Sequence, residues 1–398
     1  MLRGLPAAAR RRGLIGLAAA TLLGLAACAP QSPAPGVVGI APPIGAAAPQ
    51  AAPMARAALL LPLSGQTAPL GQAMLNAATM ALFDEAPSGV EFLPRDTAGT
   101  PAGAAAAARQ AIADGARAII GPLTSAEAAA VAPVARAAGV PMLAFTNDAQ
   151  RAGENTWVLG ITPQQQVRRI VSATAQEGAQ RFVLAAPNTE FGRALAEGMR
   201  SAAADLRLPL PAIALHPATA DPAMAAGAAR AAAPQADALL LGETGDRARR
   251  FVAAYAAEAR AALADGAAPG PGPELLGTAL WLNDPALRAD GALAGARFPG
   301  PDASARARFE QRYAEAFRDT PPRVAATAYD AAALTARALR SGTPIGTVTA
   351  TRAFDGADGP VRLLPGGQTQ RGLAIFTLSA TGDAVVLEDA PAPAGAGF

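Results

Sequence analysis

The sequence predicts an α/β protein built on parallel sheets, and the segment Arg117–Asp148 gives the strongest indication. Two short apolar runs, Ala118–Ile120 and Val140–Phe145, flank an Ala- and Val-rich stretch with a helical pattern. Gly121-Pro122 stops the first run, and Gly139 stands where the helix is expected to end. A strand, a helix and a second strand with such short connections form a βαβ unit, whose strands are parallel.

Small polar residues follow both of these strands, at Gly121–Ser125 and Thr146–Asp148. Ligands of open parallel sheets bind outside the carboxyl ends of the strands. The two segments are therefore expected to line a binding crevice.

The composition permits two lobes and argues against a nucleic-acid-binding protein. The chain has 398 residues and 51% hydrophobic content, enough for more than one core. Its formal charge of +2 depends on Arg3, Arg10, Arg11 and Arg12, without which 29 basic residues face 31 acidic ones. The rest of the chain is therefore not basic, and it has no dense run of arginines with interleaved aromatic residues.

Residues 1–27 have the layout of a secretory signal. Arginines without acidic residues precede an apolar run, Leu14–Ala27, which is shorter than the ~20 residues that cross a membrane. The run ends Leu25-Ala26-Ala27-Cys28, which resembles the bacterial lipobox. This resemblance implies that Cys28 carries lipid and becomes the mature N-terminus. The alternative is an ordinary cleaved leader followed by a chance cysteine.

Residues 28–55 are expected to tether the folded part to a membrane. From Pro30 to Pro53 the chain is mainly Ala, Pro and Gly, which offer little to bury. In the lipoprotein sorting pattern that this region resembles, an Asp in place of Ala29 retains the protein at the inner membrane. Ala29 therefore implies the periplasmic face of the outer membrane, with the inner membrane as the alternative.

Further βα units follow the central one. Strands are expected at 182–185, 213–215 and 238–241, separated by helical stretches. In a later helix, Phe309, Tyr313 and Phe317 recur at i, i+4 and i+8, which favours a buried aromatic stripe. After Phe354 the pattern changes to Gly-rich turns and short alternating strands.

Four segments, in chain order, resemble the type I periplasmic binding proteins, and the leucine-binding group in particular. They are LLLPLSG at 59–65, IIGPLTSAEAAAVAPVARAAGVPMLAF at 119–145, TEFGRALAEGM at 189–199 and AYDAAALTARAL at 328–339. The resemblance implies two lobes, each a parallel sheet flanked by helices, with three crossovers and a ligand cleft between them. From the two runs of βα units, the first lobe is expected at 56–160 plus 278–358. The second is expected at 161–277 plus 359–398.

A second resemblance within this family concerns the lipoprotein activators of penicillin-binding proteins. LLLPLSG and the sequence Gly121-Pro122-Leu123 are similar to their motifs. Those proteins use this fold to contact a peptidoglycan synthase. The helical-repeat domain that usually precedes it does not occur in this sequence.

The resemblance to leucine-binding proteins implies a crevice that holds the carboxylate and ammonium groups of an amino acid. Matching residues are Thr124 and Ser125 at a helix N-terminus, together with Thr146 and Phe191. The alternative is a capping box, in which Thr124 and Glu127 satisfy that helix end by themselves. Glu243 either receives an ammonium group or is a solvated loop acid. The full set of cleft candidates is Ser64, Thr124, Ser125, Thr146, Asn147, Phe191, Glu243 and Tyr329.

Signatures of enzymes, metals and cofactors are missing from the sequence. It has one histidine, His216, and no cysteine besides Cys28, so a Cys/His zinc cluster cannot form. A Ser-His-Asp triad would need His216, and the sequence contains no G-x-S-x-G nucleophile elbow. We therefore expect a non-enzymatic envelope lipoprotein that contacts a penicillin-binding protein. The alternative is the solute receptor of an ABC permease for amino acids or related molecules. A cleft that offers partners to both ends of an amino acid would favour the receptor.

Overall fold

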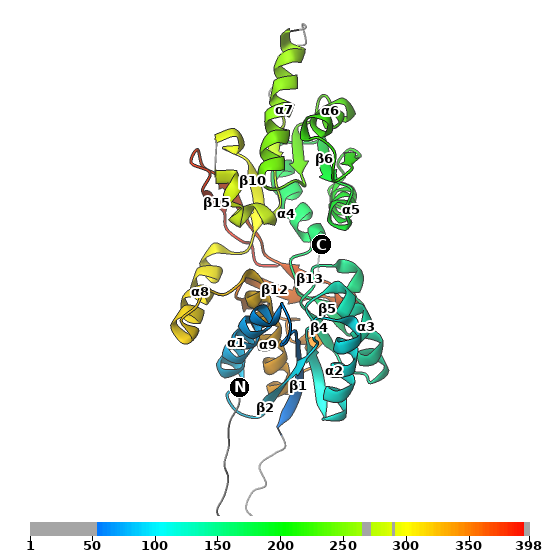
Figure 1. Cartoon of the computed structure of the whole chain (residues 1–398), viewed down its shortest axis with the longest axis vertical. Helices are drawn as coiled ribbons and strands as arrows, with labels where there is room; N and C mark the ends of the chain where they lie inside the picture. The colour runs from blue at the N-terminus through cyan, green and yellow to red at the C-terminus, as the bar shows by residue number, and fades with distance from the viewer. Residues whose placement is uncertain (1–53, 265–271, 289–290, 394–398) are drawn as a thin grey trace, which may run out of the picture. The chain divides into compact units, whose positions relative to one another are not determined.

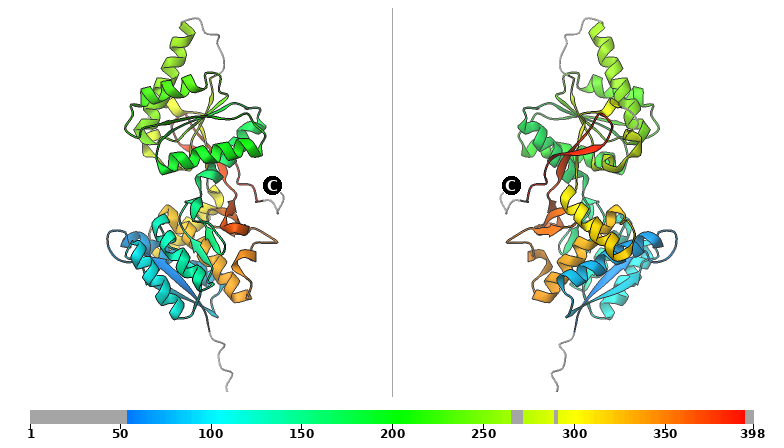
Figure 2. Two further views of the ribbon diagram at one scale, coloured as in Figure 1. Left: turned by 90° about the vertical axis from the view of Figure 1, so that its right-hand side faces the viewer. Right: turned by 90° about the vertical axis from the view of Figure 1, so that its left-hand side faces the viewer.

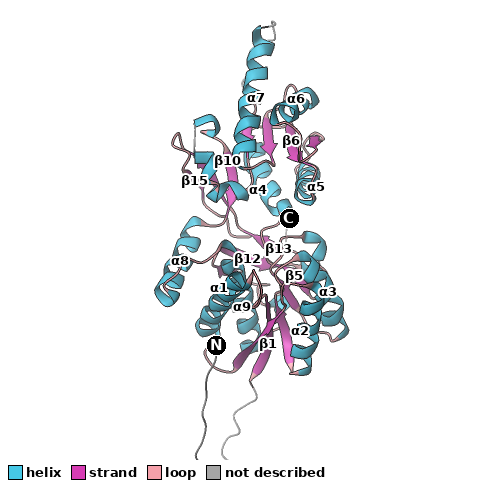
Figure 3. Cartoon of the chain, in the orientation of Figure 1, coloured by secondary structure: helices cyan, strands magenta, loops and turns pink. Residues whose placement is uncertain are grey.

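The computed structural model describes residues 54–264, 272–288 and 291–393. Two large sheets flanked by helices, and one small sheet, make up this part of the chain (Figures 1 and 3). The predicted two-lobed α/β class is confirmed. The expected leader, Cys28 and nearly all of the expected tether lie outside the described residues.

The first lobe contains a five-stranded parallel sheet in the order β2-β1-β3-β4-β5. Its strands are β1 (Ala55–Leu61), β2 (Val90–Asp96), β3 (Ala116–Ile120), β4 (Met142–Ala144) and β5 (Thr156–Val158). Its helices are α1 (Ala68–Glu85), α2 (Pro101–Ala113), α3 (Ser125–Ala137), α8 (Ala303–Phe317) and α9 (Arg323–Ser341).

Strand β1 shows how this sheet is covered on both faces. Leu59 and Leu61 pack in the core formed with α1, α8 and α9, whereas Ala58 and Leu60 pack against α2 and α3. Successive side chains of a strand point to opposite faces, so the continuous apolar run of β1 serves two cores. On α8 the expected aromatic stripe is confirmed, because Phe309 and Tyr313 are buried in the first of these cores.

The second lobe contains a seven-stranded sheet in the order β15-β14-β10-β9-β8-β6-β7. Its strands are β6 (Phe182–Pro187), β7 (Ala212–His216), β8 (Ala238–Leu241), β9 (Glu274–Leu276), β10 (Arg297–Gly300), β14 (Ala374–Leu378) and β15 (Ala384–Glu388). Its helices are α4 (Pro163–Gln176), α5 (Glu190–Asp205), α6 (Pro222–Ala232) and α7 (Gly245–Ala264) (Figure 2). The neighbouring strands β7, β6, β8, β9 and β10 are parallel. Strand β14 is antiparallel to β10, and β15 is antiparallel to β14, so this sheet is mixed.

A small antiparallel sheet follows α9 in the chain. It consists of β11 (Phe354–Gly356), β12 (Gly359–Leu363) and β13 (Thr369–Arg371). Val361 and Leu363 are buried in the core of the first lobe. This sheet therefore belongs with the first lobe in its packing.

The chain passes between the lobes after β5, after β10 and after β13, and two of these crossings differ from the expected boundaries. Residues 278–300 were expected in the first lobe, but β10 pairs with β9 and β14 of the second sheet. Residues 359–371 were expected in the second lobe, but β12 and β13 pair with each other and pack on the first. Pairing between strands that are distant in sequence determines both boundaries. The local sequence does not indicate such pairing.

A buried ion pair connects β13, the last strand before the third crossing, to helix α9 of the first lobe. Arg371 at the end of β13 donates to Asp330 of α9 at 2.7 Å, and both side chains are fully buried. Asp330 also accepts the backbone N–H of Ala357 at 2.6 Å. Removing one partner of such a pair leaves an uncompensated buried charge, so loss of either side chain should destabilise this contact between β13 and α9.

Candidate functional site

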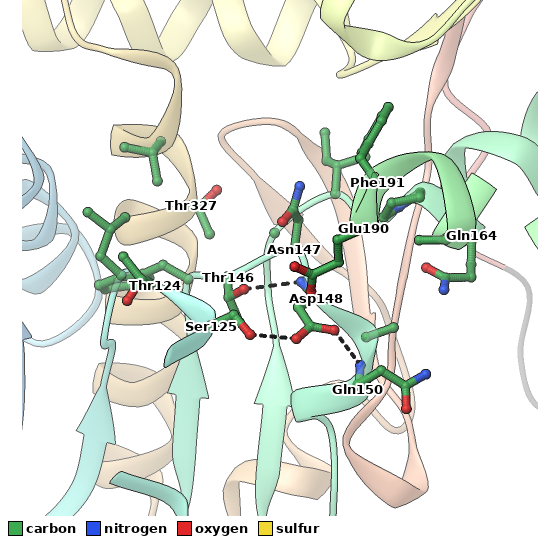
Figure 4. A pocket seen from close by; sticks show the side chains of 18 of the residues that line it. Thr124, Ser125, Thr146, Asn147, Asp148, Gln150, Gln164, Glu190, Phe191 and Thr327 are labelled. Atoms are coloured by element: carbon green, nitrogen blue, oxygen red, sulfur yellow. Dashed lines mark hydrogen bonds between the residues drawn. The ribbon is translucent and has the colours of Figure 1, made fainter. Parts of the chain in front are cut away.

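A cleft of about 810 Å³ lies where the chain passes between the two lobes. The first lobe contributes the loops that follow β3 and β4, and the start of α9. The second lobe contributes the first turns of α4 and α5. Figure 4 shows these side chains converging on the cleft. The cleft thus lies at the carboxyl ends of parallel strands, as the sequence predicted.

The N-terminus of α3 is closed by the capping box. Thr124 donates its backbone N–H and its hydroxyl to the Glu127 carboxylate at 3.0 and 2.8 Å, and its hydroxyl accepts the Glu127 N–H at 3.2 Å. Glu127 is fully buried. Both groups that would have bound a ligand carboxylate at Thr124 are therefore used within the protein.

A second carboxylate of the protein, that of Asp148, lies beside the same helix end. Ser125 donates its hydroxyl to Asp148 at 2.5 Å (Figure 4). Arg151 donates its Nε to the same carboxylate at 2.8 Å. Partial burial opposes ionisation of Asp148, but hydrogen bonds from Ser125, Gln150 and Arg151 hold its pKa below the ordinary value. This wall of the cleft therefore contains an ionised carboxylate that is paired with Arg151.

Three other expected residues also line the cleft. Thr146 accepts the backbone N–H of Asp148 at 3.1 Å. Asn147 is exposed, and its amide makes no hydrogen bond to the described residues. Phe191 lies in the first turn of α5, whose end is capped by Thr189. Together with Thr124 and Ser125, five of the eight candidates line one cleft.

The structure places the other three candidates elsewhere. Ser64 is exposed and bonds to Asp96, whose pKa it helps to lower. Tyr329 faces α1, where its hydroxyl donates to Asp84 at 2.5 Å. Glu243 is buried and is paired with Arg247 at 2.8 Å. Neither expected role for Glu243 fits, because it is not solvated and its charge already has a partner.

Three charged residues of the cleft were not among the predicted candidates. They lie in the segment that returns from the second lobe to the first. They are Arg306 of α8, Arg323 at the start of α9, and Asp358 before β12. Arg306 is paired with Asp358 at 3.1 Å and with Glu310 at 2.5 Å. Although burial alone would lower it, these two carboxylates raise the pKa of Arg306.

Arg323 differs from Arg306 in its partners. Its Nη1 donates to the backbone oxygen of Ala279 in the second lobe at 3.2 Å, and no carboxylate of the described residues lies within ion-pair distance. Burial lowers the pKa of Arg323, and the neighbouring Arg306 adds to this effect, whereas the charges of Asp358 and Glu310 oppose it. An arginine remains charged under such conditions, so the cleft contains a cation without a paired anion.

Residues 54–264, 272–288 and 291–393 contain neither a candidate metal site nor a candidate membrane span. No group of three or more His, Cys, Asp or Glu side chains in these ranges is arranged to hold a metal ion. No helix in the same part of the chain combines the length and the apolar character needed to cross a membrane.

Two α/β lobes with a cleft at the carboxyl ends of their strands define a two-lobed binding protein. The model of the periplasmic binding protein family matches residues 55–383. The chain belongs to this family, which implies a periplasmic location. A comparison with curated proteins gave no match.

Solved structures with the same fold include transport components and one other protein. The ABC transporter substrate-binding protein from Sphaerobacter thermophilus has a TM-score of 0.62 and 21% identity, over 85% of this chain and 98% of its own. The Leu-, Ile-, Val-, Thr- and Ala-binding protein from Brucella ovis has a TM-score of 0.64 and 16% identity, over 87% and 98%. LpoA from Haemophilus influenzae has a TM-score of 0.67 and 16% identity, over 85% of this chain but 60% of its own. At these identities the likeness concerns the fold alone.

Proposed function

We propose that this protein is a non-enzymatic envelope lipoprotein that regulates peptidoglycan synthesis by contact with a penicillin-binding protein. The observation that favours this over amino-acid transport is the closed wall at α3. Glu127 and Asp148 fill the places that the resemblance assigns to a ligand carboxylate. A like charge placed against them costs several kcal/mol.

The residues for the ammonium end support the same choice. Phe191 has no hydroxyl to offer, and Glu243 lies outside the cleft in an ion pair with Arg247. In the pose that the resemblance implies, the ammonium group of a leucine-type amino acid would therefore lack these two partners, which costs roughly 1–3 kcal/mol for each unpaired polar group.

Anchoring and location form part of the proposal. Lipid on Cys28 would hold the protein at the periplasmic face of the outer membrane, and residues 28–55 would let the lobes extend towards a synthase. If so, Cys28→Ala should release the protein from the membrane fraction. Continued membrane attachment of that variant would contradict the lipid anchor.

The edge strand β15 is a surface on which such a contact could form. Val385, Val386 and Leu387 are 50%, 39% and 50% exposed at the end of the second sheet. Exposed apolar residues on an unpaired strand edge favour association with another protein. Leu387→Arg should therefore weaken capture of the synthase, whereas Leu210→Arg, at a site 88% exposed elsewhere, should not.

A second function, that of a solute receptor for an ABC permease, is favoured by one observation. The cleft has a volume of about 810 Å³ and is lined by both polar and apolar side chains, as a small-molecule site would be. The deciding experiment combines calorimetry of the purified protein against the α-amino acids with a pull-down using the cell's bifunctional penicillin-binding proteins. Capture of a synthase supports the proposal. Micromolar amino-acid binding without a captured synthase would make the protein a transport receptor.

A further inference from the structure

Helix α9 begins at the cleft without a cap. Pro322 occupies its N-cap position, where it offers no side-chain acceptor, and the first turn contains no acidic residue. The backbone N–H groups of Arg323 and Val324 donate to none of the described residues, and both residues line the cleft. In a helix of 19 residues, these groups present a partial positive charge.

The side chain of Arg323 adds a full charge at the same place. A guanidinium has five N–H donors, and within the described residues Arg323 uses one of its two Nη groups, on the Ala279 carbonyl. Arg306, the neighbouring cation, is neutralised by Glu310 and Asp358. This wall therefore holds two arginines and two carboxylates, and Arg323 is the arginine that forms no ion pair.

Thr327 provides an independent observation. It lies four residues after Arg323 and thus on the same face of the helix. It is only 7% exposed and lines the cleft, yet its hydroxyl has no hydrogen-bond partner among the described residues. Figure 4 shows Thr327 beside the cleft, on the side of Thr124. Because no group of the described residues occupies this hydroxyl, it is available to a molecule bound in the cleft.

We propose that Arg323, Thr327 and the first N–H groups of α9 form a subsite for the carboxylate of a small ligand. The planar guanidinium matches a carboxylate in two parallel hydrogen bonds, and the helix end and the hydroxyl supply further donors. This subsite goes beyond the proposed function, because it states what the cleft binds whether the protein serves a synthase or a permease.

The other walls restrict the ligand to a single negative charge. Asp148 and Glu190 line the cleft on these other walls, and hydrogen bonds hold the pKa of Asp148 below its ordinary value. These carboxylates disfavour a polyanion such as an organic phosphate. They suit a monocarboxylate, or a zwitterion whose ammonium points away from Arg323.

Calorimetry of the purified full-length protein tests the subsite with three matched pairs of probes. The pairs are hexanoate and hexanamide, benzoate and benzamide, and β-alanine and β-alaninamide. We expect at least one carboxylate to bind at millimolar concentration or below, about tenfold or more tightly than its amide. Failure of all three carboxylates to bind, or equal binding of acid and amide, would overturn the proposal.

Substitutions test whether Arg323 and Thr327 cause the preference for carboxylates over amides. Arg323→Gln should remove the preference for the acid, and Arg323→Lys should keep part of it. Arg193→Gln, at another cleft arginine, should leave it intact. Thr327→Val should weaken carboxylate binding, whereas Thr335→Val, in the same helix but outside the cleft lining, should not. Unchanged binding by Arg323→Gln, with a thermal melt like that of the parent, would contradict the assignment.

Discussion

The helices α3 and α9 both begin at the cleft, but they treat their N-termini in opposite ways. Helix α3 is closed by Thr124 and Glu127, and Asp148 adds a second carboxylate beside it. Helix α9 has no cap and carries an unpaired cation, Arg323. A helix end that the protein satisfies by itself has little left for a ligand, whereas an uncapped end keeps its donors available.

The difference shows that family resemblance does not fix the polarity of a cleft. The resemblance places a ligand carboxylate at Thr124 and Ser125, but there the protein supplies its own negative charge. The arginine that forms no ion pair, Arg323, lies at the start of α9, in a segment that returns from the second lobe. Four changes test this contrast.

Removing the acid that closes α3 should have the largest effect on stability. Glu127→Ala leaves the N–H and hydroxyl of Thr124 without their acceptor, and should lower the free energy of unfolding by roughly 2–3 kcal/mol. Glu127→Gln keeps an acceptor of the same shape and should cost less. Urea unfolding measures both.

Glu190→Ala is the control for Glu127. Glu190 is also acidic and in the first turn of a helix, but it is exposed and its carboxylate makes no hydrogen bond to the described residues. If Glu190→Ala destabilises as much as Glu127→Ala, the loss reflects first-turn charge in general and not the closure of α3.

Neutralising Asp148 should have a moderate effect on stability and make α3 resemble α9. Asp148→Asn keeps an acceptor oxygen for the neighbouring donors but loses the ion pair with Arg151. Because that pair is partly exposed, the loss should be about 1 kcal/mol or less. The variant should also bind L-leucine about tenfold more tightly than the parent, since a like charge is removed. Leucine binding that does not change in calorimetry would show that Asp148 is not what excludes a ligand carboxylate.

The sequence predicted α3 well because its determinants are local. Thr124 and Glu127 are three residues apart, and both the capping box and the helix follow from that spacing. The same holds for the aromatic stripe of α8. The pairing of Ser125 with Asp148 spans 23 positions, and only the fold brings them together.

The place of Arg323 in the cleft and the strand character of β10 could not be predicted, and the physical reason is the same for both. Pro321-Pro322-Arg323 indicates a helix start, but the partners of Arg323 depend on the second crossing between the lobes. Arg297–Gly300 is short and contains a proline, so its strand character comes from β9 and β14 on either side. Tertiary context decided both features.

Closing the end of α9 should have a smaller effect on stability and a clear effect on binding. Val324→Glu places a carboxylate in the first turn beside Arg323, and should raise the free energy of unfolding by roughly 0.3–1 kcal/mol. The same carboxylate should occupy the proposed subsite and remove the preference for carboxylates over amides. Val324→Gln, which lacks the charge, is the control. If the two variants bind carboxylates equally well, the charge at this helix end has no role in recognition.

The smallest expected effect is on the free energy of unfolding at acidic pH. It is seen in the difference between the parent and Asp148→Asn. The folded protein holds the pKa of Asp148 below its ordinary value, because the hydrogen bonds to Ser125, Gln150 and Arg151 outweigh partial burial. The unfolded chain therefore binds a proton more readily. The stabilisation from Asp148 is fully present above about pH 4, its unfolded range, and is lost as the pH falls through the lowered value. Urea unfolding of both proteins over a pH series should show a constant gap near neutrality that closes in acid. Because the other titrating groups are common to both proteins, they cancel in this gap. A gap that stays constant into strong acid would show that the ionised carboxylate does not stabilise this wall.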